Sequence, residues 1–114
     1  MKLNLENHDA AQDMIILIEK DKCLSATDAI KFSINQDIHD KILNTGWASI
    51  ALELWGHDDP DREWNKMEEP YIEVEIEENK LKLIEDIAKK EKVDIVTAVS
   101  YFLIFTMDTL GYHI

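Results

Sequence analysis

Acidic side chains and one histidine gather between residues 57 and 63, in a stretch that first suggests a metal site. The residues are His57, Asp58, Asp59, Asp61 and Glu63. Carboxylate oxygens and imidazole nitrogens bind calcium and zinc, but the spacing here matches neither the calcium loop nor a zinc motif. Helix capping explains part of the cluster instead, because Asp59 precedes Pro60 and acidic residues follow in the first turn. We therefore expect no metal and no cofactor.

Catalytic groups are scarce in the remainder of the sequence. The other histidines, His8, His39 and His113, are scattered, and no Ser/His/Asp or Cys/His order stands out. The single cysteine, Cys23, ends an apolar helical stretch and is typical of a small buried hydrophobic residue. The three glycines form no glycine-rich phosphate loop. These features predict a protein that is not an enzyme.

The charge balance favours a protein partner over nucleic acid. The chain has 114 residues, with 24 Asp and Glu against 12 Lys and Arg, and a formal net charge of −12. Such a charge repels nucleic acid and anionic membranes, and it accelerates encounter with basic surfaces. The alternative is that the acidity serves only solubility. We expect a basic protein partner, no nucleic acid and no membrane.

Length and composition indicate one globular domain that spans residues 1–114. Hydrophobic residues make up 46% and charged residues 32% of the sequence, as is typical of a globular chain. No apolar run approaches the roughly 18 residues that a membrane helix needs. The first residues lack the features of a signal peptide, and one cysteine excludes an internal disulfide. Together these features predict a cytoplasmic protein.

Two short stretches alternate between apolar and polar residues, which is the pattern of a strand with one buried face. In the first stretch, residues 2–6, Leu3 and Leu5 are the apolar positions. In the second, residues 72–77, Ile72, Val74 and Ile76 are apolar. The polar residues between them define a predicted outward face: Lys2, Asn4, Glu6, Glu73, Glu75 and Glu77.

The apolar pattern repeats at an offset of 69 positions, which places Leu3 on Ile72 and Ile15 on Ile84. After each strand the spacing predicts two helices, over 9–22 and 29–42 in the first unit, and from 78 and then 95–110 in the second. The apolar run "IVTAVSYFLIF" predicts a central last helix. We expect the core to contain these residues: Ile15, Ile18, Val99, Phe102 and Leu103.

The expected fold class is mainly α with a short two-stranded antiparallel ribbon. Two strand–helix–helix units, about 2–44 and 71–111, are joined by a helical connector, 45–70. In the connector, the spacing predicts a short helix with Trp47, Ile50, Ala51 and Leu54 on one side, then a helix capped by Asp59. The tryptophans Trp47, Trp55 and Trp64 either cover the core or form an aromatic patch for a partner.

The order strand, helix, helix, taken twice, resembles the ribbon–helix–helix superfamily. Members of that family are normally homodimers whose paired strands enter the DNA major groove and whose outward side chains contact base edges. The resemblance implies a single-chain pseudo-dimer, or a homodimer that swaps its strands. It also implies that the second helix of each unit holds a phosphate at its N-terminus, where Ser25 and Asp94 are the expected N-caps here.

The outward face departs from what DNA binding in this family requires. Lys2 and Asn4 are acceptable base readers, but three glutamates between phosphates carry a large electrostatic cost. We therefore expect a small acidic protein-binding module, such as an inhibitor, antitoxin, immunity or anti-defence protein. Its expected partner-binding residues are the outward face and the three tryptophans. The alternatives are a ribbon–helix–helix DNA-binding transcriptional regulator, and glutamates that only keep a strand edge soluble.

Overall fold

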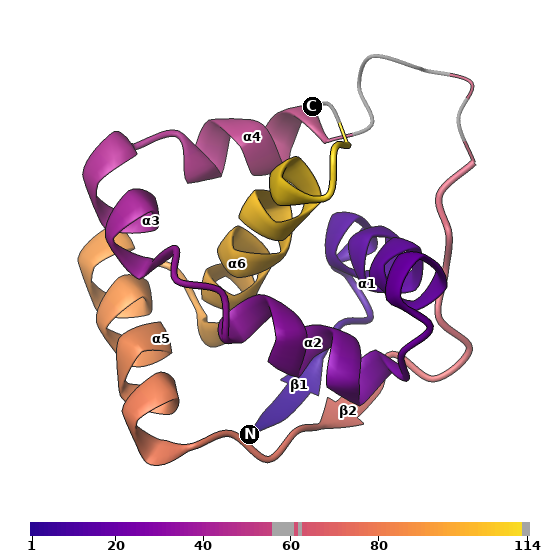
Figure 1. Cartoon of the computed structure of the whole chain (residues 1–114), viewed down its shortest axis with the longest axis horizontal. Coiled ribbons are helices and arrows are strands. Elements are labelled where there is room, and N and C mark those ends of the chain that lie inside the picture. The colour runs from indigo at the N-terminus through magenta and orange to yellow at the C-terminus, as the bar shows by residue number, and fades with distance from the viewer. Residues whose placement is uncertain (56–60, 62, 113–114) are drawn as a thin grey trace.

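The structure, a computed structural model, describes residues 1–55, 61 and 63–112. In this part the chain is mainly helical, with six helices and one two-stranded antiparallel sheet, which confirms the expected class (Figure 1). The elements are β1 (Lys2–Asn4), α1 (Asp9–Lys22), α2 (Ala26–Ile34), α3 (His39–Thr45), α4 (Ala48–Leu54), β2 (Tyr71–Glu73), α5 (Glu78–Glu91) and α6 (Ile95–Thr109).

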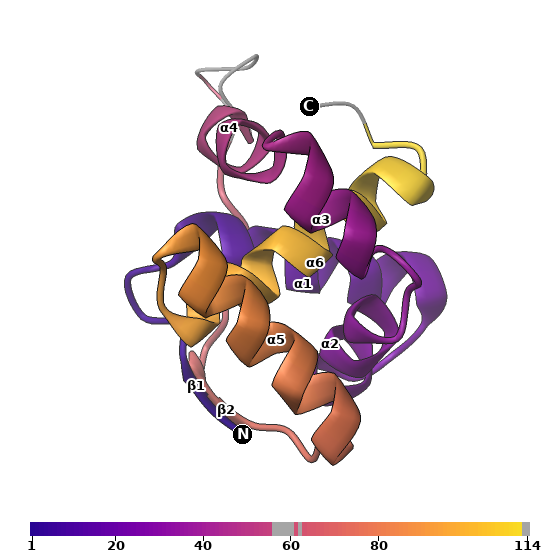
Figure 2. The same ribbon diagram turned by 90° about the vertical axis from the view of Figure 1, so that its left-hand side faces the viewer.

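The strands β1 and β2 pair antiparallel, as expected from the repeat at an offset of 69 positions, with Leu3 opposite Ile72. Each strand has three residues, so both are shorter than the predicted 2–6 and 72–77. After β1 the chain turns toward α1, and the backbone N–H of His8 donates to Leu5 O at 3.0 Å in this turn. On the other strand, the chain beyond Val74 leaves the ribbon toward α5 (Figure 2).

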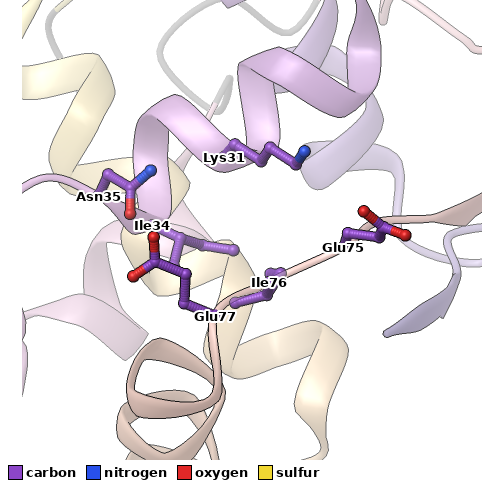
Figure 3. A pocket seen from close by; sticks show the side chains of 6 residues that line it. All are labelled: Lys31, Ile34, Asn35, Glu75, Ile76 and Glu77. Carbon is purple, nitrogen blue, oxygen red and sulfur yellow. The ribbon is translucent and has the colours of Figure 1, made fainter.

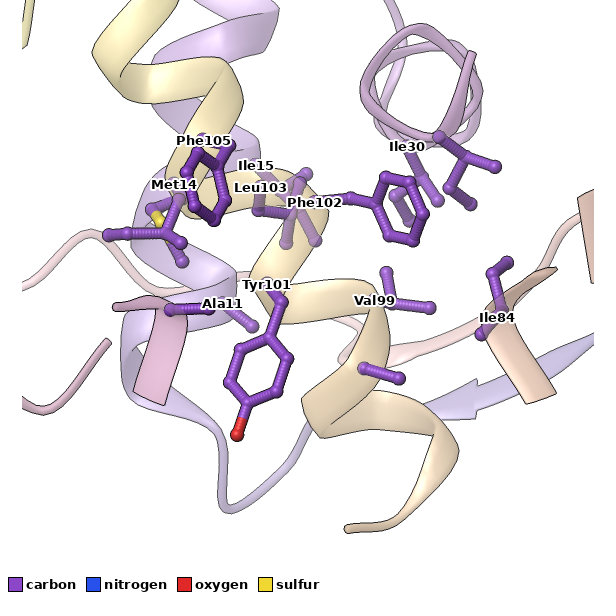
Figure 4. Close-up of a cluster of buried hydrophobic side chains, with 14 of the residues drawn as sticks. Ala11, Met14, Ile15, Ile30, Ile84, Val99, Tyr101, Phe102, Leu103 and Phe105 are labelled. Carbon is purple, nitrogen blue, oxygen red and sulfur yellow. The ribbon is translucent and has the colours of Figure 1, made fainter. Parts of the chain in front are cut away.

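The helix α6 lies at the centre of the molecule and contacts the other five described helices and β1 (Figures 1 and 2). Every residue from Ala98 to Met107 is buried. The predicted core positions Val99, Phe102 and Leu103 are 0–1% exposed, and they pack with side chains from α1, α2 and α5 (Figure 4). A helix that is apolar on all sides is stable only when its whole circumference is covered.

The ribbon bonds and the helix ends match at an offset of 69 residues. Leu5 N donates to Pro70 O at 2.7 Å, and Val74 N donates to Met1 O at 2.8 Å. The two donors, Leu5 and Val74, are 69 positions apart in the sequence, and so are the two acceptors, Met1 and Pro70. The helices α1 and α5 each have 14 residues and begin 69 positions apart.

The turns that follow these two helices also match. Cys23 and Lys92, 69 positions apart, both cap their helices in the left-handed conformation, with φ of 55° and 57°. Non-glycine residues adopt this conformation infrequently, so its recurrence indicates that the same turn is built twice. The next residues in the chain then start α2 and α6, each behind an N-cap that accepts a backbone N–H.

The predicted helix over 29–42 is wrong, because the chain forms two helices, α2 and α3, with a break between them. At the break the polar residues bond locally. Gln36 Nε2 donates to Phe32 O at 3.0 Å, and Ile38 N donates to Gln36 O at 2.9 Å. Asn and Asp side chains also compete for backbone groups and weaken helices. In α6 the matching positions are Ile104, Phe105 and Thr106, and that helix continues.

The predicted apolar side of α4 is only partly the buried one. The sequence pattern placed Trp47, Ile50, Ala51 and Leu54 on one side, and Ala51 is buried, but Ile50 and Leu54 are 55% and 50% exposed. The buried residues are Ala48 and Ala51, with Trp55 just after the helix. Since α4 lies directly against α6, the small alanine side chains allow close approach of the two backbones, whereas larger residues on that face would not fit.

The second predicted helix of the connector is not formed in its described part, since residues 63–70 have no helical turn. The expected caps Asp59 and Pro60 lie outside the described residues. The backbone N–H of Asn65 donates to the Asp13 carboxylate at 3.0 Å, and that of Met67 donates to Gln12 Oε1 at 2.9 Å. These bonds to α1 take the place of the bonds that a helix would make.

The buried carboxylate of Asp13 joins three parts of the chain. Besides the Asn65 backbone, it accepts from Trp55 Nε1 at 2.8 Å and from Asn65 Nδ2 at 2.9 Å. Its neighbour Gln12 donates through Nε2 to Leu5 O at 2.6 Å. A buried charged group requires such partners, because water no longer solvates it. The connector therefore depends on α1 for its position.

Replacement of Phe102 by Ala should destabilise the protein by about 3–5 kcal/mol, because the ring is 1% exposed and its removal leaves a cavity in the core. Urea unfolding followed by circular dichroism measures this change. Leu54→Ala is the control, since this residue is half exposed; it should cost less than about 1 kcal/mol. A cost as small as the control's for Phe102→Ala would contradict the central placement of α6.

Replacement of Asp13 by Asn should destabilise the protein by about 1.5–3 kcal/mol. The amide NH₂ then faces a donor, either on Trp55 or on Asn65, so one buried group loses its partner. Asp21→Asn on the exposed end of α1 is the control and should change stability by less than about 0.5 kcal/mol. Equal urea midpoints for the two variants would show that the carboxylate is dispensable.

Candidate functional site

The outer side of the ribbon is polar, as the alternation predicted. Leu3 is buried and Ile72 is half-buried on the inner side, while Lys2, Asn4 and Glu73 are exposed. Lys2 lies opposite Glu73 in the register. Side chains of opposite charge that face each other across two strands stabilise the pairing of those strands. The outer side of the paired strands is therefore mixed in charge and carries one of the three predicted glutamates, Glu73.

Tyr71 is an outward residue of the ribbon that the sequence analysis missed. It lies opposite Asn4 and is 61% exposed. Its hydroxyl donates to Glu6 Oε2 at 2.7 Å, and this hydrogen bond, together with the charge of Glu6, raises the pKa of Tyr71. The backbone N–H of Glu6 donates to Asn4 Oδ1 at 3.1 Å. The alternation with a period of two already places Tyr71 on the same side of the strand as Glu73, so the sequence pattern was sufficient to identify it.

The other two glutamates, Glu75 and Glu77, lie beyond β2 in the segment that leads to α5. Both are exposed, as predicted. They line a hollow of about 150 Å³ where this segment passes the last turn of α2 (Figure 3). The remaining lining residues are Lys31, Ile34, Asn35 and Ile76. The predicted outward face is thus divided between the ribbon itself and the rim of this hollow.

The three tryptophans do not form one exposed patch. Trp55 is 2% exposed and bonded to Asp13, so its ring belongs to the core and is closed to a partner. Trp64 is half-buried against the core. Trp47 is 36% exposed and packs edge to face on Phe105, with 5.0 Å between ring centroids. The structure therefore agrees with the packing alternative for Trp55.

The N-caps of α2 and α6 differ in charge. Ser25 Oγ accepts from Asp28 N at 3.2 Å, whereas the Asp94 carboxylate accepts from Thr97 N at 2.8 Å. Hydrogen bonds from Thr97, first from its side chain and then from its backbone N–H, are the main reason why the pKa of Asp94 lies below its ordinary value of 3.8. The N-terminus of α6 is thus already occupied by a negative group, which repels a phosphate at the same position.

The metal-site alternative gains nothing from the structure. Among the described residues, no group of three His, Cys, Asp or Glu side chains is arranged to hold a metal ion. Most of the acidic stretch at 57–63 lies outside the described residues.

In the described chain, no helix has the length and apolarity required to cross a bilayer. The sequence matches no family model, and no curated protein and no solved structure matches the chain.

The cap at Asp94 predicts a pH dependence of stability. Asp94→Ala should destabilise the protein by about 0.5–2 kcal/mol at neutral pH, because α6 loses its N-cap, whereas Asp94→Asn retains an acceptor, loses only the charge and should fall between wild type and Asp94→Ala. Because the folded pKa is lowered, the carboxylate stabilises the fold above its unfolded pKa. The advantage of wild type over Asp94→Ala should therefore shrink as the pH falls below 3.8.

Urea unfolding between neutral pH and pH about 2.5 measures this dependence. The difference between Asp94→Asn and Asp94→Ala is the control, since neither side chain titrates; it should stay constant over the range. A wild-type advantage that does not change with pH would contradict the role of the charged cap.

Proposed function

We propose that this protein is a small acidic protein-binding module that docks on a basic surface of a partner protein, as an inhibitor, antitoxin, immunity or anti-defence protein does. The observation that carries the proposal is the set of exposed carboxylates at Glu6, Glu73, Glu75 and Glu77, on and beside the ribbon. Such groups exclude a phosphate backbone and attract Arg and Lys.

We further propose that the fold is a single-chain version of the ribbon–helix–helix arrangement, with 2–44 and 71–111 as its two halves. The matched ribbon bonds, helix lengths and left-handed caps at an offset of 69 residues support this arrangement. Because both strands come from one chain, the ribbon is complete without a second copy. We therefore propose a monomer, and a strand-swapped homodimer is the alternative.

Several features argue against a DNA-reading role for this ribbon. Base readout in a groove requires outward donors and acceptors, while contacts to phosphate supply most of the affinity. Here Glu73 opposes Lys2 at the paired strands, and Asp94 adds a negative charge at the start of α6. The net charge of −12 adds repulsion over the whole surface. A protein surface rich in Arg and Lys is attracted by these negative charges and is not repelled by them.

The alternative function is a ribbon–helix–helix DNA-binding transcriptional regulator. Its support is the pair Lys2 and Asn4, which are exposed on the paired strands and are side chains that read base edges. An electrophoretic shift with a pool of random duplexes at about 150 mM salt separates the two functions. The acidic-module proposal requires no shift, whereas a sequence-specific shift would establish the regulator.

The docking surface is tested by reversing its charge. The variant with Glu73, Glu75 and Glu77 changed to Lys should lose capture of its partner from cells that naturally make the protein. The control changes Glu53, Glu85 and Asp108 to Lys, which are exposed and lie on α4, α5 and α6. Both variants have the same net charge, so only the position of the charge differs.

Exposed carboxylates contribute about 0–1 kcal/mol each, whereas desolvated pairs with Arg contribute several times more. The triple variant should therefore bind at least about tenfold more weakly than the control, since tenfold corresponds to about 1.4 kcal/mol. Quantitative mass spectrometry of the captured proteins measures the ratio, and circular dichroism verifies the fold. Equal capture by both variants would leave the glutamates only the role of keeping a strand edge soluble.

A further inference from the structure

The hollow beside the ribbon has an apolar floor and an acidic rim. Ile34, which is buried, and Ile76, which is half-buried, supply the apolar atoms. The exposed carboxylates of Glu75 and Glu77 lie at the rim, and the Asn35 amide is beside Glu77 (Figure 3). The volume is about 150 Å³. An occupant of this hollow must have an apolar stem and a group that carboxylates and an amide oxygen can bind.

The end of α2 adds to the negative potential at this place. Asn35 is the C-cap residue of the nine-residue helix, so the last turn of α2 forms one wall. Carbonyl groups at a helix C-terminus carry a partial negative charge and favour cations. Three sources of negative potential, two carboxylates and one helix end, therefore lie around a hollow with an apolar floor, and Lys31 is the one positive group among its lining residues.

We infer that this hollow binds an arginine side chain of the partner protein, an inference that rests on the proposed function. The aliphatic stem lies over Ile34 and Ile76, because long cationic side chains bury their methylene groups on apolar surface. The guanidinium reaches Glu77 and the Asn35 side-chain oxygen, while Glu75 at the other end of the hollow adds its negative charge (Figure 3). Arginine fits better than lysine, since its planar fork of donors bonds several acceptors at once and is more weakly hydrated.

The protein's own Lys31 forms part of the wall and supplies a means of tuning the site. It is half-buried, and its stem crosses the hollow on the side of Glu75 (Figure 3). Its ammonium is a cation of the same kind as the incoming group, and like charges at close range repel. Loss of this charge should therefore strengthen the binding of arginine, whereas a merely structural role for Lys31 would not.

The experiment titrates the ¹⁵N-labelled protein with N-acetyl-arginine methylamide and follows the amide chemical shifts. The citrulline analogue has the same shape without the charge and is the control ligand. The arginine probe should give saturable shifts confined to residues 31–35 and 75–77, and the citrulline probe should give none there. Shifts of equal size from citrulline, or unsaturable shifts spread over all acidic surfaces, would overturn the inference.

Three variants test the hollow itself. Asn35→Tyr fills it without removing a carboxylate, and the pair Glu75→Gln with Glu77→Gln removes the charge without filling it. Each should weaken the arginine probe at least about tenfold, as expected for lost charge-assisted bonds. Lys31→Gln should strengthen binding about two- to fivefold, an effect of the size of one partly exposed charge.

The matched controls are Glu53→Gln with Asp108→Asn for the carboxylates and Lys90→Gln for the lysine. All three residues are exposed, and α4, which carries Glu53, lies at the opposite end of the molecule from the ribbon (Figures 1 and 2). None of these controls should change the affinity by more than about twofold, because screened charges at this distance contribute little. Effects equal to those of the hollow variants would overturn the inference.

A divalent cation is the competing occupant. Titration with calcium chloride or magnesium chloride should not produce the same saturable shifts, and if it does, the hollow is a metal site.

The experiments can contradict the inference and the proposed function separately. Absence of arginine binding overturns the hollow alone, while partner capture can still depend on Glu73, Glu75 and Glu77. Unchanged capture by the triple-lysine variant overturns the proposed function, while the hollow can still bind free arginine.

Discussion

The burial of α6 is the constraint on which the rest of the structure depends. From Ala98 to Met107 this helix presents no exposed residue, so it must be covered on every side. The helices α1, α2, α3 and α5 and the strand β1 cover part of it, and α4, from the chain between the two segments, covers a further part. Neither strand–helix–helix segment could bury this surface alone. The chain between the two segments is therefore part of the core and not only a link, and its small residues Ala48 and Ala51 allow α4 to lie close.

The polar groups inside the fold have a second role, because they hold the non-helical part of the connector, residues 63–70, against α1. Asp13 and Gln12 occupy buried positions of α1, where an apolar residue would be ordinary. Together they accept or donate five hydrogen bonds to Leu5, Trp55, Asn65 and Met67. A burial cost that would be high for an isolated carboxylate is offset by this many donors. The same groups also specify one position of the connector, since an apolar contact would not distinguish between registers.

Local signals predicted the parts of the fold that local physics decides. The alternation predicted the two strands and their inner side, and Ser25 and Asp94 were correctly placed as N-caps, while the antiparallel pairing was expected from the repeat at an offset of 69 positions. The predictions that were wrong concern features that depend on contacts between residues far apart in the sequence. Periodicity could not place Ile50 and Leu54 outward, because the close approach of α4 to α6 selects the alanine side. Likewise, the sequence of residues 63–70 carries no sign that its backbone donors bond to α1. At the candidate site, the outward glutamates followed from the pattern, but the hollow beside Glu75 and Glu77 forms only when α2 is brought against the chain that follows β2.

The ribbon separates the residues that hold the fold from those that face solvent. Leu3, Leu5 and Val74 are buried and anchor the strands on the core, whereas their neighbours Lys2, Asn4 and Glu73 point to solvent. Backbone hydrogen bonds hold the pairing and do not depend on the outward side chains. The outward positions can therefore change from cationic or amide groups to carboxylates at little cost in stability. A surface with this freedom can exchange one class of partner for another, because the electrostatic sign of the face decides encounter while the geometry of the strands stays the same. This independence is why the proposed ribbon–helix–helix arrangement and the carboxylates on and beside its ribbon can point to different partners.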